Sequence, residues 1–280
     1  MSRPLSSLTQ RVLTALVLVP LVVAAILLLS PPGFAALLGL FVLGGAWEWS
    51  AMAGLGDTRR RVAYVLVTAA VLGLVYGLLA RPAAGPLLLL LALVWWALAA
   101  ALVVRFQLQG VFTTGGPWSR GASGLLILVP AWFALVVLHR QEAGGPWLVL
   151  FLLVLIWGAD TAAFFVGRRW GSRRLASRVS PGKSWEGVAG AVVAVLVLAL
   201  AVGEPLGFGE SLVPFLTLVA LTVAASVLGD LTESLYKREA GLKDSGSLLP
   251  GHGGVLDRID SLTAAAPLFV LGLYGMGRVA

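Results

Sequence analysis

Residues 211–279 read SLVPFLTLVALTVAASVLGDLTESLYKREAGLKDSGSLLPGHGGVLDRIDSLTAAAPLFVLGLYGMGRV, in which two long apolar runs flank a charged segment from Asp230 to Asp260. This 31-residue segment holds six carboxylates, four lysine or arginine side chains and one of the two histidines of the chain. Carboxylates hold hard cations, and lysine and arginine hold phosphate groups. The pattern predicts metal-assisted phosphate chemistry, and the simpler alternative is a solvated loop whose charges pair with one another.

The composition is that of a membrane protein. Of 280 residues, 59% are apolar and 12% are charged, whereas soluble domains carry about 25% charged residues. So few charges cannot cover a soluble surface, so we predict a polytopic membrane protein. The net charge of +7 lies in short loops between apolar runs, which indicates membrane topology rather than nucleic-acid binding. The absence of cysteine excludes disulfides and thiolate metal sites.

Nine stretches are apolar and long enough to cross a bilayer as helices, because a span needs about 20 such residues and must satisfy its own backbone hydrogen bonds. They are roughly 11–29, 34–52, 62–80, 86–104, 121–138, 147–166, 186–203, 211–236 and 262–279. We predict a single all-α membrane domain over residues 1–280, with its charged signature at 230–260. The first stretch could pass for a signal peptide, but it is long for one and lacks a clear cleavage site, so we expect it to be retained.

Lysine and arginine are divided unequally between the two sets of loops. With nine spans, 17 of the 20 fall in the N-terminal segment and alternate loops, and three (Arg81, Arg140 and Arg278) fall on the other side. Cytoplasmic loops carry such an excess. We therefore expect a cytoplasmic N-terminus, an outer C-terminus, and the basic loops 167–185 and 237–261 together on the cytoplasmic side.

Asp230 lies near the cytoplasmic end of the span 211–236, still within it. An ionisable residue inside a span is a candidate functional residue. Ser234 follows one turn later on the same face, and Lys237 and Arg238 come about one turn after that. A plain ion pair of Asp230 with Lys237 or Arg238 is the structural alternative.

Asp257 and Asp260 are spaced i, i+3 at the start of the last span. In a helix both would lie on one face, and the helix dipole alone would account for one acidic residue there. The turn 250–254 precedes them, and its glycines would leave backbone N–H groups free for phosphate oxygens. A plain flexible turn is the alternative. His252 in this turn is compatible with a phosphate donor, a proton carrier or a turn residue.

A second cluster joins Asp160, near the end of another span, to the basic loop 167–185. Gly182-Lys183-Ser184 in this loop invites comparison with a P-loop. The P-loop pattern needs glycine where this chain has Ser177, and we expect no strand before it, so we reject a P-loop. The arginines of this loop are explained by topology and contact with anionic lipid, whereas Lys183 is the more specific candidate.

Trp47-Glu48-Trp49 lies near the cytoplasmic end of the second span. Aromatic residues are enriched where helices cross the membrane surface. We interpret this motif as an interfacial anchor and give Glu48 no further role.

The segment 230–260 resembles the signature of the CDP-diglyceride synthase family, the phosphatidate cytidylyltransferases. The matching positions are Ser234, Lys237-Arg238, Lys243-Asp244, Gly246, Leu249-Pro250, His252-Gly253-Gly254, Asp257-Arg258 and Asp260. Tyr236 departs from the pattern, since the family usually has an aliphatic residue there. Asp160-Thr161 and the run 180–187 also look like family motifs, whereas the spans between resemble the family only in hydropathy and number.

The resemblance implies that CTP and phosphatidate give CDP-diacylglycerol and pyrophosphate, in phospholipid biosynthesis at the cytoplasmic face of a bacterial plasma membrane. It implies a divalent metal, Mg²⁺, on Asp230, Asp257 and Asp260, with a second ion left open. The catalytic residues it implies are Asp230, Asp257, Asp260, Lys237 and Arg238. The substrate-binding residues it implies are Asp160, Lys183, Ser234, Lys243, Asp244, His252, Gly253, Gly254 and Arg258.

Two other functions remain open at this point. An ion-coupled transporter would use the intramembrane carboxylates Asp160 and Asp230 as a proton or cation path. A related cytidylyltransferase would act on an isoprenoid lipid, because nothing in the sequence fixes the lipid tails. As partners we expect CTP, phosphatidate in the cytoplasmic leaflet and membrane lipid, without nucleic acid, and the oligomeric state, a homodimer included, stays open.

Overall fold

The protein is an all-α polytopic membrane protein. The computed structural model describes residues 7–81, 84–110, 115–142, 144–246 and 253–279, with side chains from Leu16 onward. Within these ranges the helices are α1 (Ser7–Leu28), α2 (Pro31–Met52), α3 (Thr58–Leu78), α4 (Ala84–Gln109), α5 (Pro117–His139), α6 (Gly145–Trp170), α7 (Trp185–Val202), α8 (Leu212–Glu239) and α9 (Leu256–Gly275). A short 3₁₀ turn (Gly209–Ser211) precedes α8, and two strands, β1 (Arg174–Ala176) and β2 (Ser180–Ser184), lie between α6 and α7.

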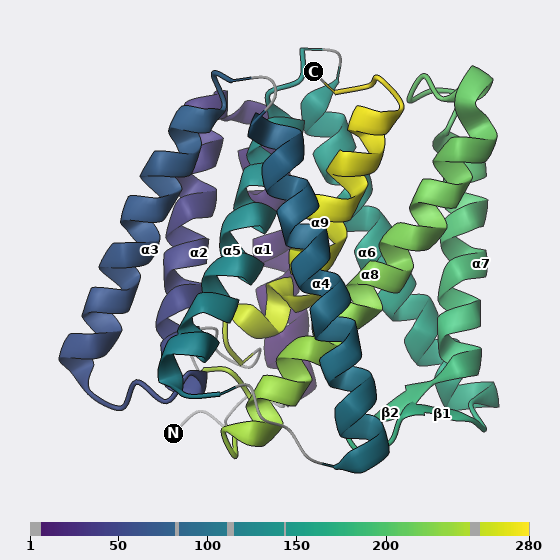
Figure 1. Ribbon diagram of the computed structural model, residues 1–280. Coiled ribbons are helices and arrows are strands. Elements are labelled where there is room, and N and C mark those ends of the chain that lie inside the picture. The colour runs from purple at the N-terminus through teal and green to yellow at the C-terminus, as the bar shows by residue number, and fades with distance from the viewer. Residues whose placement is uncertain (1–6, 82–83, 111–114, 143, 247–252, 280) are drawn as a thin grey trace, which may run out of the picture.

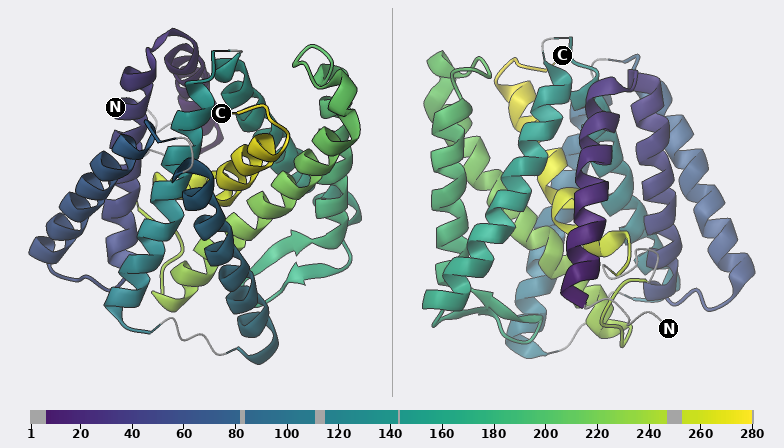
Figure 2. Two further views of the ribbon diagram at one scale, coloured as in Figure 1. Left: turned by 45° about the horizontal axis from the view of Figure 1, so that its top comes forward. Right: turned by 180° about the vertical axis from the view of Figure 1, so that it is seen from behind.

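The helices run side by side between two ends of the molecule (Figure 1). The strands and the end of α8 lie at the lower end in Figure 1, which we call the hairpin end, and α9 begins in the lower half, above the end of α8. The start of α1 and the connection from α2 to α3 lie at this end too, as the view from behind shows (Figure 2). The two most basic loops of the sequence therefore reach the same end of the helices.

Seven of the described helices, α2 to α8, are long and apolar enough to cross a membrane. The apolar part of α1 with described side chains, Leu16–Leu28, is shorter, and α9 begins with charged residues. Leu87, Leu91 and Val94 on α4 leave more than half of their surface exposed, as apolar side chains that face lipid do. The count of nine spans and the orientation of the N-terminus stay predictions.

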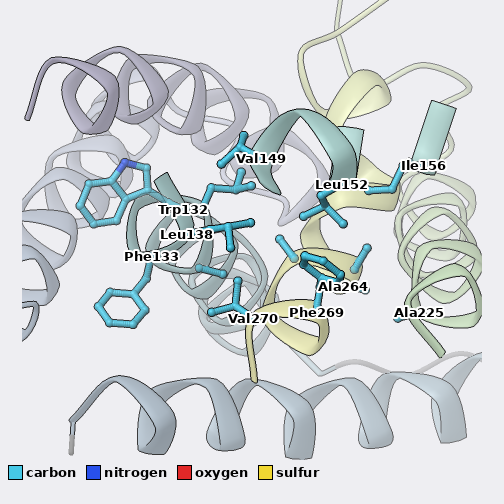
Figure 3. Close-up of a cluster of buried hydrophobic side chains, with 14 of the residues drawn as sticks. Trp132, Phe133, Leu138, Val149, Leu152, Ile156, Ala225, Ala264, Phe269 and Val270 are labelled. Atoms are coloured by element: carbon cyan, nitrogen blue, oxygen red, sulfur yellow. The ribbon is translucent and has the colours of Figure 1, made fainter. Parts of the chain in front are cut away.

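The core surrounds α9. Ala264, Ala265 and Ala266 are fully buried, and such small residues let neighbouring helices approach closely. Phe269 and Val270, one turn further on, are fully buried as well. Side chains of α5, α6 and α8 close around this face of α9 (Figure 3). The helix that carries Asp257 and Asp260 at its start is thus held rigidly at the centre of the molecule.

The ends of α8 and α9 differ from the prediction. We predicted a span ending at residue 236 and another beginning at 262, whereas α8 continues to Glu239 and α9 begins at Leu256. Hydropathy ends a span where charges begin, but a helix continues through the charged membrane surface and into water. As a result Asp257 and Asp260 both lie in the first turns of α9, and their i, i+3 spacing is helical.

The strands correct a second prediction, since we expected no strand before Lys183. β1 and β2 form an antiparallel pair, and Lys183 lies in β2, one residue before the N-cap of α7. The N-cap residue Ser184 accepts a hydrogen bond from the Gly187 N–H at 3.2 Å. Strands of three and five residues are too short to show a reliable alternation in sequence. Ser177 still replaces the P-loop glycine, and Lys183 lies on a strand, not in a glycine loop.

Candidate active site

Lys183 of β2 forms an ion pair with Asp230 of α8, with 2.6 Å between Nζ and Oδ2. The two side chains remain 23% and 27% exposed, so a ligand can reach them. Ser234 Oγ donates a weak hydrogen bond to Asp230 Oδ1 at 3.3 Å. The partner of Asp230 is therefore neither Lys237 nor Arg238 but a lysine from the other basic loop, which brings the two loops to one place.

Two further carboxylates interact electrostatically with this pair, Asp260 of α9 and Asp160 of α6. Asp260 is partly buried, and its Oδ1 accepts a hydrogen bond from the Ser261 N–H at 2.7 Å. Asp160 lies on an exposed face of α6. Gly229 brings Asp230 and Asp260 together, because a Cβ there would overlap the carbonyl oxygen of Asp260. Four segments far apart in the sequence thus contribute to one group of charges.

Lys237 of α8 lies between two other carboxylates. Its Nζ is 2.7 Å from Asp257 Oδ1 and 3.2 Å from Glu233 Oε1. The three side chains are at most 13% exposed. Apart from the Lys237 ammonium, neither oxygen of Glu233 has a hydrogen-bond partner in the described part of the chain. Glu233 also interacts electrostatically with Asp260, so this group adjoins the one around Asp230. The i, i+4 spacing of Glu233 and Lys237 was the signal in the sequence that we did not use.

Asp257 is bound by groups of the protein itself. Besides Lys237, its carboxylate accepts hydrogen bonds from the backbone N–H groups of Gly254 at 2.8 Å and Ser245 at 3.1 Å. Both of its oxygens are thus engaged by donors of the protein. Over the described ranges of the chain, no three acidic, imidazole or thiol side chains are grouped so as to hold a metal ion. Of the three predicted ligands, Asp260 interacts electrostatically with Asp230 and Asp257 pairs with Lys237, so the assignment of all three to a metal stays a prediction.

Of the glycine turn before α9, the structure describes Gly253 and Gly254, and the N–H of Gly254 is not free. The N–H of Gly254 is bound by Asp257, and those of Val255 and Leu256 donate to Glu48 at 3.0 and 2.9 Å. Two carboxylates of the protein thus occupy the N–H groups of residues 254–256. Gly253 adopts a φ of +79°, which glycine reaches without strain. His252 lies outside the described residues.

The remaining predicted residues lie at the rim of the site. Lys243, Asp244 and Arg258 are exposed, so they can meet a ligand that arrives from water. Arg238 Nε lies 3.5 Å from the carbonyl oxygen of Val179, which places its guanidinium beside the hairpin. The rim is therefore basic on both of its loops.

Carboxylates outnumber lysines within the basic rim. Five carboxylates (Asp160, Asp230, Glu233, Asp257 and Asp260) and two lysines (Lys183 and Lys237) are joined by these ion pairs and electrostatic interactions. Carboxylates that repel one another are stabilised by a bound cation. The arrangement thus combines a region that attracts metal cations with a basic rim that attracts phosphate.

Comparison with known proteins identifies the family. The sequence model of the cytidylyltransferase family matches residues 9–275. The chain belongs to the cytidylyltransferase family. The match includes the hairpin, α8 and α9, so the family assignment that we drew from residues 230–260 is confirmed.

Several relatives of this cytidylyltransferase are called phosphatidate cytidylyltransferase. The protein of that name from Pseudomonas aeruginosa is 49% identical over 271 residues, which cover 96% of this chain and 98% of the relative. The one from Haemophilus influenzae is 40% identical over 279 residues, covering 94% and 97%. The one from Bacillus subtilis is 42% identical over 144 residues, about half of each chain. The similarity thus extends well beyond the signature segment.

One further residue of this cytidylyltransferase was misjudged from the sequence. Glu48, which we interpreted as part of an interfacial anchor, is 3% exposed and contacts the start of α9. Trp49 beside it is 1% exposed, whereas Trp47 stacks with the Arg61 guanidinium at 4.0 Å. The pattern of one acidic residue between two tryptophans gave no sign of this, because its contacts lie at the other end of the sequence.

Proposed function

We propose that this protein is a phosphatidate cytidylyltransferase, which converts CTP and phosphatidate to CDP-diacylglycerol and pyrophosphate. The observation that carries the proposal is the similarity, over nearly the whole chain, to two relatives of that name at 49% and 40% identity. The site supports it, since basic side chains for phosphate groups and carboxylates for a metal meet at one end of a membrane protein. We further propose that residues 1–280 form a single membrane domain.

The reaction requires the approach of two anions. A phosphate oxygen of phosphatidate attacks the α-phosphorus of CTP, the bond from that phosphorus to the bridging oxygen of the β-phosphate breaks, and pyrophosphate leaves with the bonding electrons. The attacking oxygen is already anionic, so no general base is needed. Lys183, Lys237 and Arg238, with Lys243 and Arg258 at the rim, would reduce the repulsion and orient the phosphates.

The residues present fit a magnesium ion. Asp230 and Asp260 supply hard oxygen donors, and Mg²⁺ in proteins is commonly held by one or two carboxylates together with substrate phosphates. Such a site needs no group of three protein ligands, which agrees with the geometry of the described residues. When bound, Mg²⁺ would withdraw charge from the phosphate oxygens. Asp257 then acts differently, as the carboxylate that fixes Lys237.

The membrane location matches a lipid substrate. We place the protein in the bacterial inner membrane with the hairpin end towards the cytoplasm, because 17 of its 20 lysine and arginine residues lie on that side in the nine-span arrangement. The acyl chains of phosphatidate would stay in the cytoplasmic leaflet while CTP arrives from water. This explains why the site is built at helix ends.

Incubation of the purified protein with CTP labelled in its α-phosphate tests the function. We expect label in CDP-diacylglycerol and one pyrophosphate per product when phosphatidate is the acceptor, and neither without acceptor. A polyprenyl phosphate serves as the comparison. Faster labelling of the isoprenoid acceptor would overturn the assignment of phosphatidate, and the absence of transfer to both would contradict the cytidylyltransferase activity.

The orientation can be tested because the chain contains no cysteine. Ser172 before the hairpin and Glu210 before α8 are exposed at opposite ends of the helices. We expect a cysteine at Ser172 to react with an impermeant maleimide only after the cytoplasmic side is opened, and a cysteine at Glu210 to react in intact cells. The reverse labelling would invert the topology.

Lys243→Ala is expected to raise the KM for CTP about tenfold, because one charge-assisted contact is worth roughly 1.5 kcal/mol. Lys243 is exposed on the loop that follows α8, so its loss should leave insertion intact and change the KM for phosphatidate little. Lys243→Arg keeps the charge and serves as the control. An unchanged KM for CTP in the alanine variant would show that Lys243 does not contact the nucleotide.

A further inference from the structure

Glu48 of α2 reaches across the molecule to the segment that leads into α9. Its Oε1 accepts a hydrogen bond from the Val255 N–H at 3.0 Å, and its Oε2 accepts from the Leu256 N–H at 2.9 Å and from Ser245 Oγ at 3.0 Å. Glu48 is 3% exposed, and the backbone N–H groups at the start of α9 favour its negative charge. Two separated parts of the signature loop, 245–246 and 254–256, thus contact one side chain.

The fit around this carboxylate leaves no spare room. A Cβ at either Gly246 or Gly254 would overlap the Glu48 carboxylate. Both glycines thus allow the backbone of the loop to approach Glu48 directly. The position of Glu48 and the path of the loop depend on each other.

Ser245 connects Glu48 to the active site. Its hydroxyl donates to Glu48, and its backbone N–H donates to Asp257. Asp257 in turn holds the Lys237 ammonium at 2.7 Å. A continuous series of hydrogen bonds and one ion pair therefore runs from Glu48 on α2 to Lys237 on α8, and every link is largely shielded from water.

We propose that Glu48 is a positioning residue of the active site, which fixes Ser245 and the start of α9 and so sets the position of Asp257 and Lys237. It does not contact the substrates. The inference rests on the proposed function, because the reaction that Lys237 serves is part of that proposal. The alternative is that Glu48 only caps α9, in which case its loss lowers stability and leaves turnover of the folded protein unchanged.

Glu48→Gln is the sharpest variant. Glutamine has nearly the same shape, but it offers one acceptor oxygen and an NH₂ group, which would face a backbone N–H or the Ser245 hydroxyl. Glu48→Ala removes all three contacts. Asp57→Ala is the matched control, since Asp57 is a carboxylate that caps α3 at the same end by accepting from the Arg59 N–H at 3.1 Å.

The variants are compared by kcat and KM on the monodisperse, folded protein and by hydrogen–deuterium exchange. For Glu48→Gln we expect kcat to fall at least tenfold and the KM for CTP to change less than threefold, with faster exchange confined to 245–246 and 253–258. Glu48→Ala should lose more, and Asp57→Ala should keep its kcat. Ser245→Ala should reduce kcat. The double variant with Glu48→Gln should reduce kcat by a smaller factor than the product of the two single reductions, as expected for residues in one network.

The possible failures are distinguishable. Wild-type kcat in folded Glu48→Gln would overturn the positioning role and leave Glu48 as a cap. The positioning role would also be overturned if Glu48→Gln exchanged faster throughout the molecule and Asp57→Ala lost as much kcat. Such a result would show that the loss of kcat comes from general destabilisation. If the wild type itself transfers no cytidylyl group, the proposed function fails, while the exchange pattern still tests the contact of Glu48 with the loop.

Discussion

Replacement of Asp260 by asparagine is expected to lower the rate of cytidylyl transfer about a thousandfold, while the protein still folds and inserts. Asparagine keeps the shape of the side chain and removes its charge. In the proposed site this charge holds the metal that offsets the negative charge of the reacting phosphates, which is worth several kcal/mol, and about 1.4 kcal/mol changes a rate tenfold. Asp260 is repelled by Asp230 and Glu233 and attracted by Lys237 and Lys183, so loss of its charge should change the stability of the fold little.

The matched control is Glu239→Gln. Glu239 is a carboxylate at the end of α8, paired with Arg120 at 2.5 Å and outside the group around Asp230. We expect its turnover to stay within about threefold of the wild type, as substitutions away from a site usually do. A titration with Mg²⁺ should show a raised requirement in Asp260→Asn. Near-normal turnover of Asp260→Asn with an unchanged Mg²⁺ requirement would contradict the assignment of Asp260 to the metal.

The same titration separates the two roles considered for Asp257. The family resemblance implied a metal ligand, whereas the structure joins Asp257 to Lys237 and two backbone N–H groups. Asp257→Asn should therefore slow turnover without a change in the Mg²⁺ requirement. A raised requirement, like that of Asp260→Asn, would restore the original prediction.

The sequence predicted the membrane helices well because each span carries its own signal in its hydropathy. The end of α8 and the start of α9 were not predicted correctly, because helices continue through charged residues at the membrane surface, where hydropathy falls. The β1–β2 hairpin was not predicted, because its strands are too short to show a pattern in the sequence. Local patterns thus predict where a helix crosses the membrane better than where it ends.

In the site, too, local patterns predicted some features and tertiary packing decided others. Because loops alternate between the two sides of the membrane, the sequence predicted that Lys183 and Asp230 lie on the same side. The ion pair between them, however, depends on how α8 is rotated against the hairpin. The contacts of Asp257 depend on Ser245 and Gly254, whose N–H groups donate to its carboxylate. Glu48 could not be predicted, because its partners lie about 200 residues further along the chain. Tertiary packing alone decides these contacts.

Lys237 is the position where we expect the largest loss of stability. Its ammonium lies between Glu233 and Asp257, whose side chains are 5% and 9% exposed. A charge removed from water depends on its partner, and removal of one member of a buried pair commonly costs about 3–5 kcal/mol. Lys237→Met keeps most of the volume of the side chain and leaves both carboxylates without their cation. We expect the free energy of unfolding, measured by denaturant titration in mixed micelles, to fall by about that amount, and turnover to be lost.

A second substitution separates stability from catalysis. Glu233 has no hydrogen-bond partner in the described part of the chain besides its ion pair with Lys237, so Glu233→Gln removes the charge that Lys237→Met leaves uncompensated. The double variant should therefore recover a large part of the lost stability, since replacement of both partners costs less than removal of one. It should not recover turnover, because the ammonium that neutralises phosphate is still absent. Recovery of turnover in the double variant would show that Lys237 serves the fold and not the reaction, and wild-type stability of Lys237→Met would show that the two carboxylates do not depend on it.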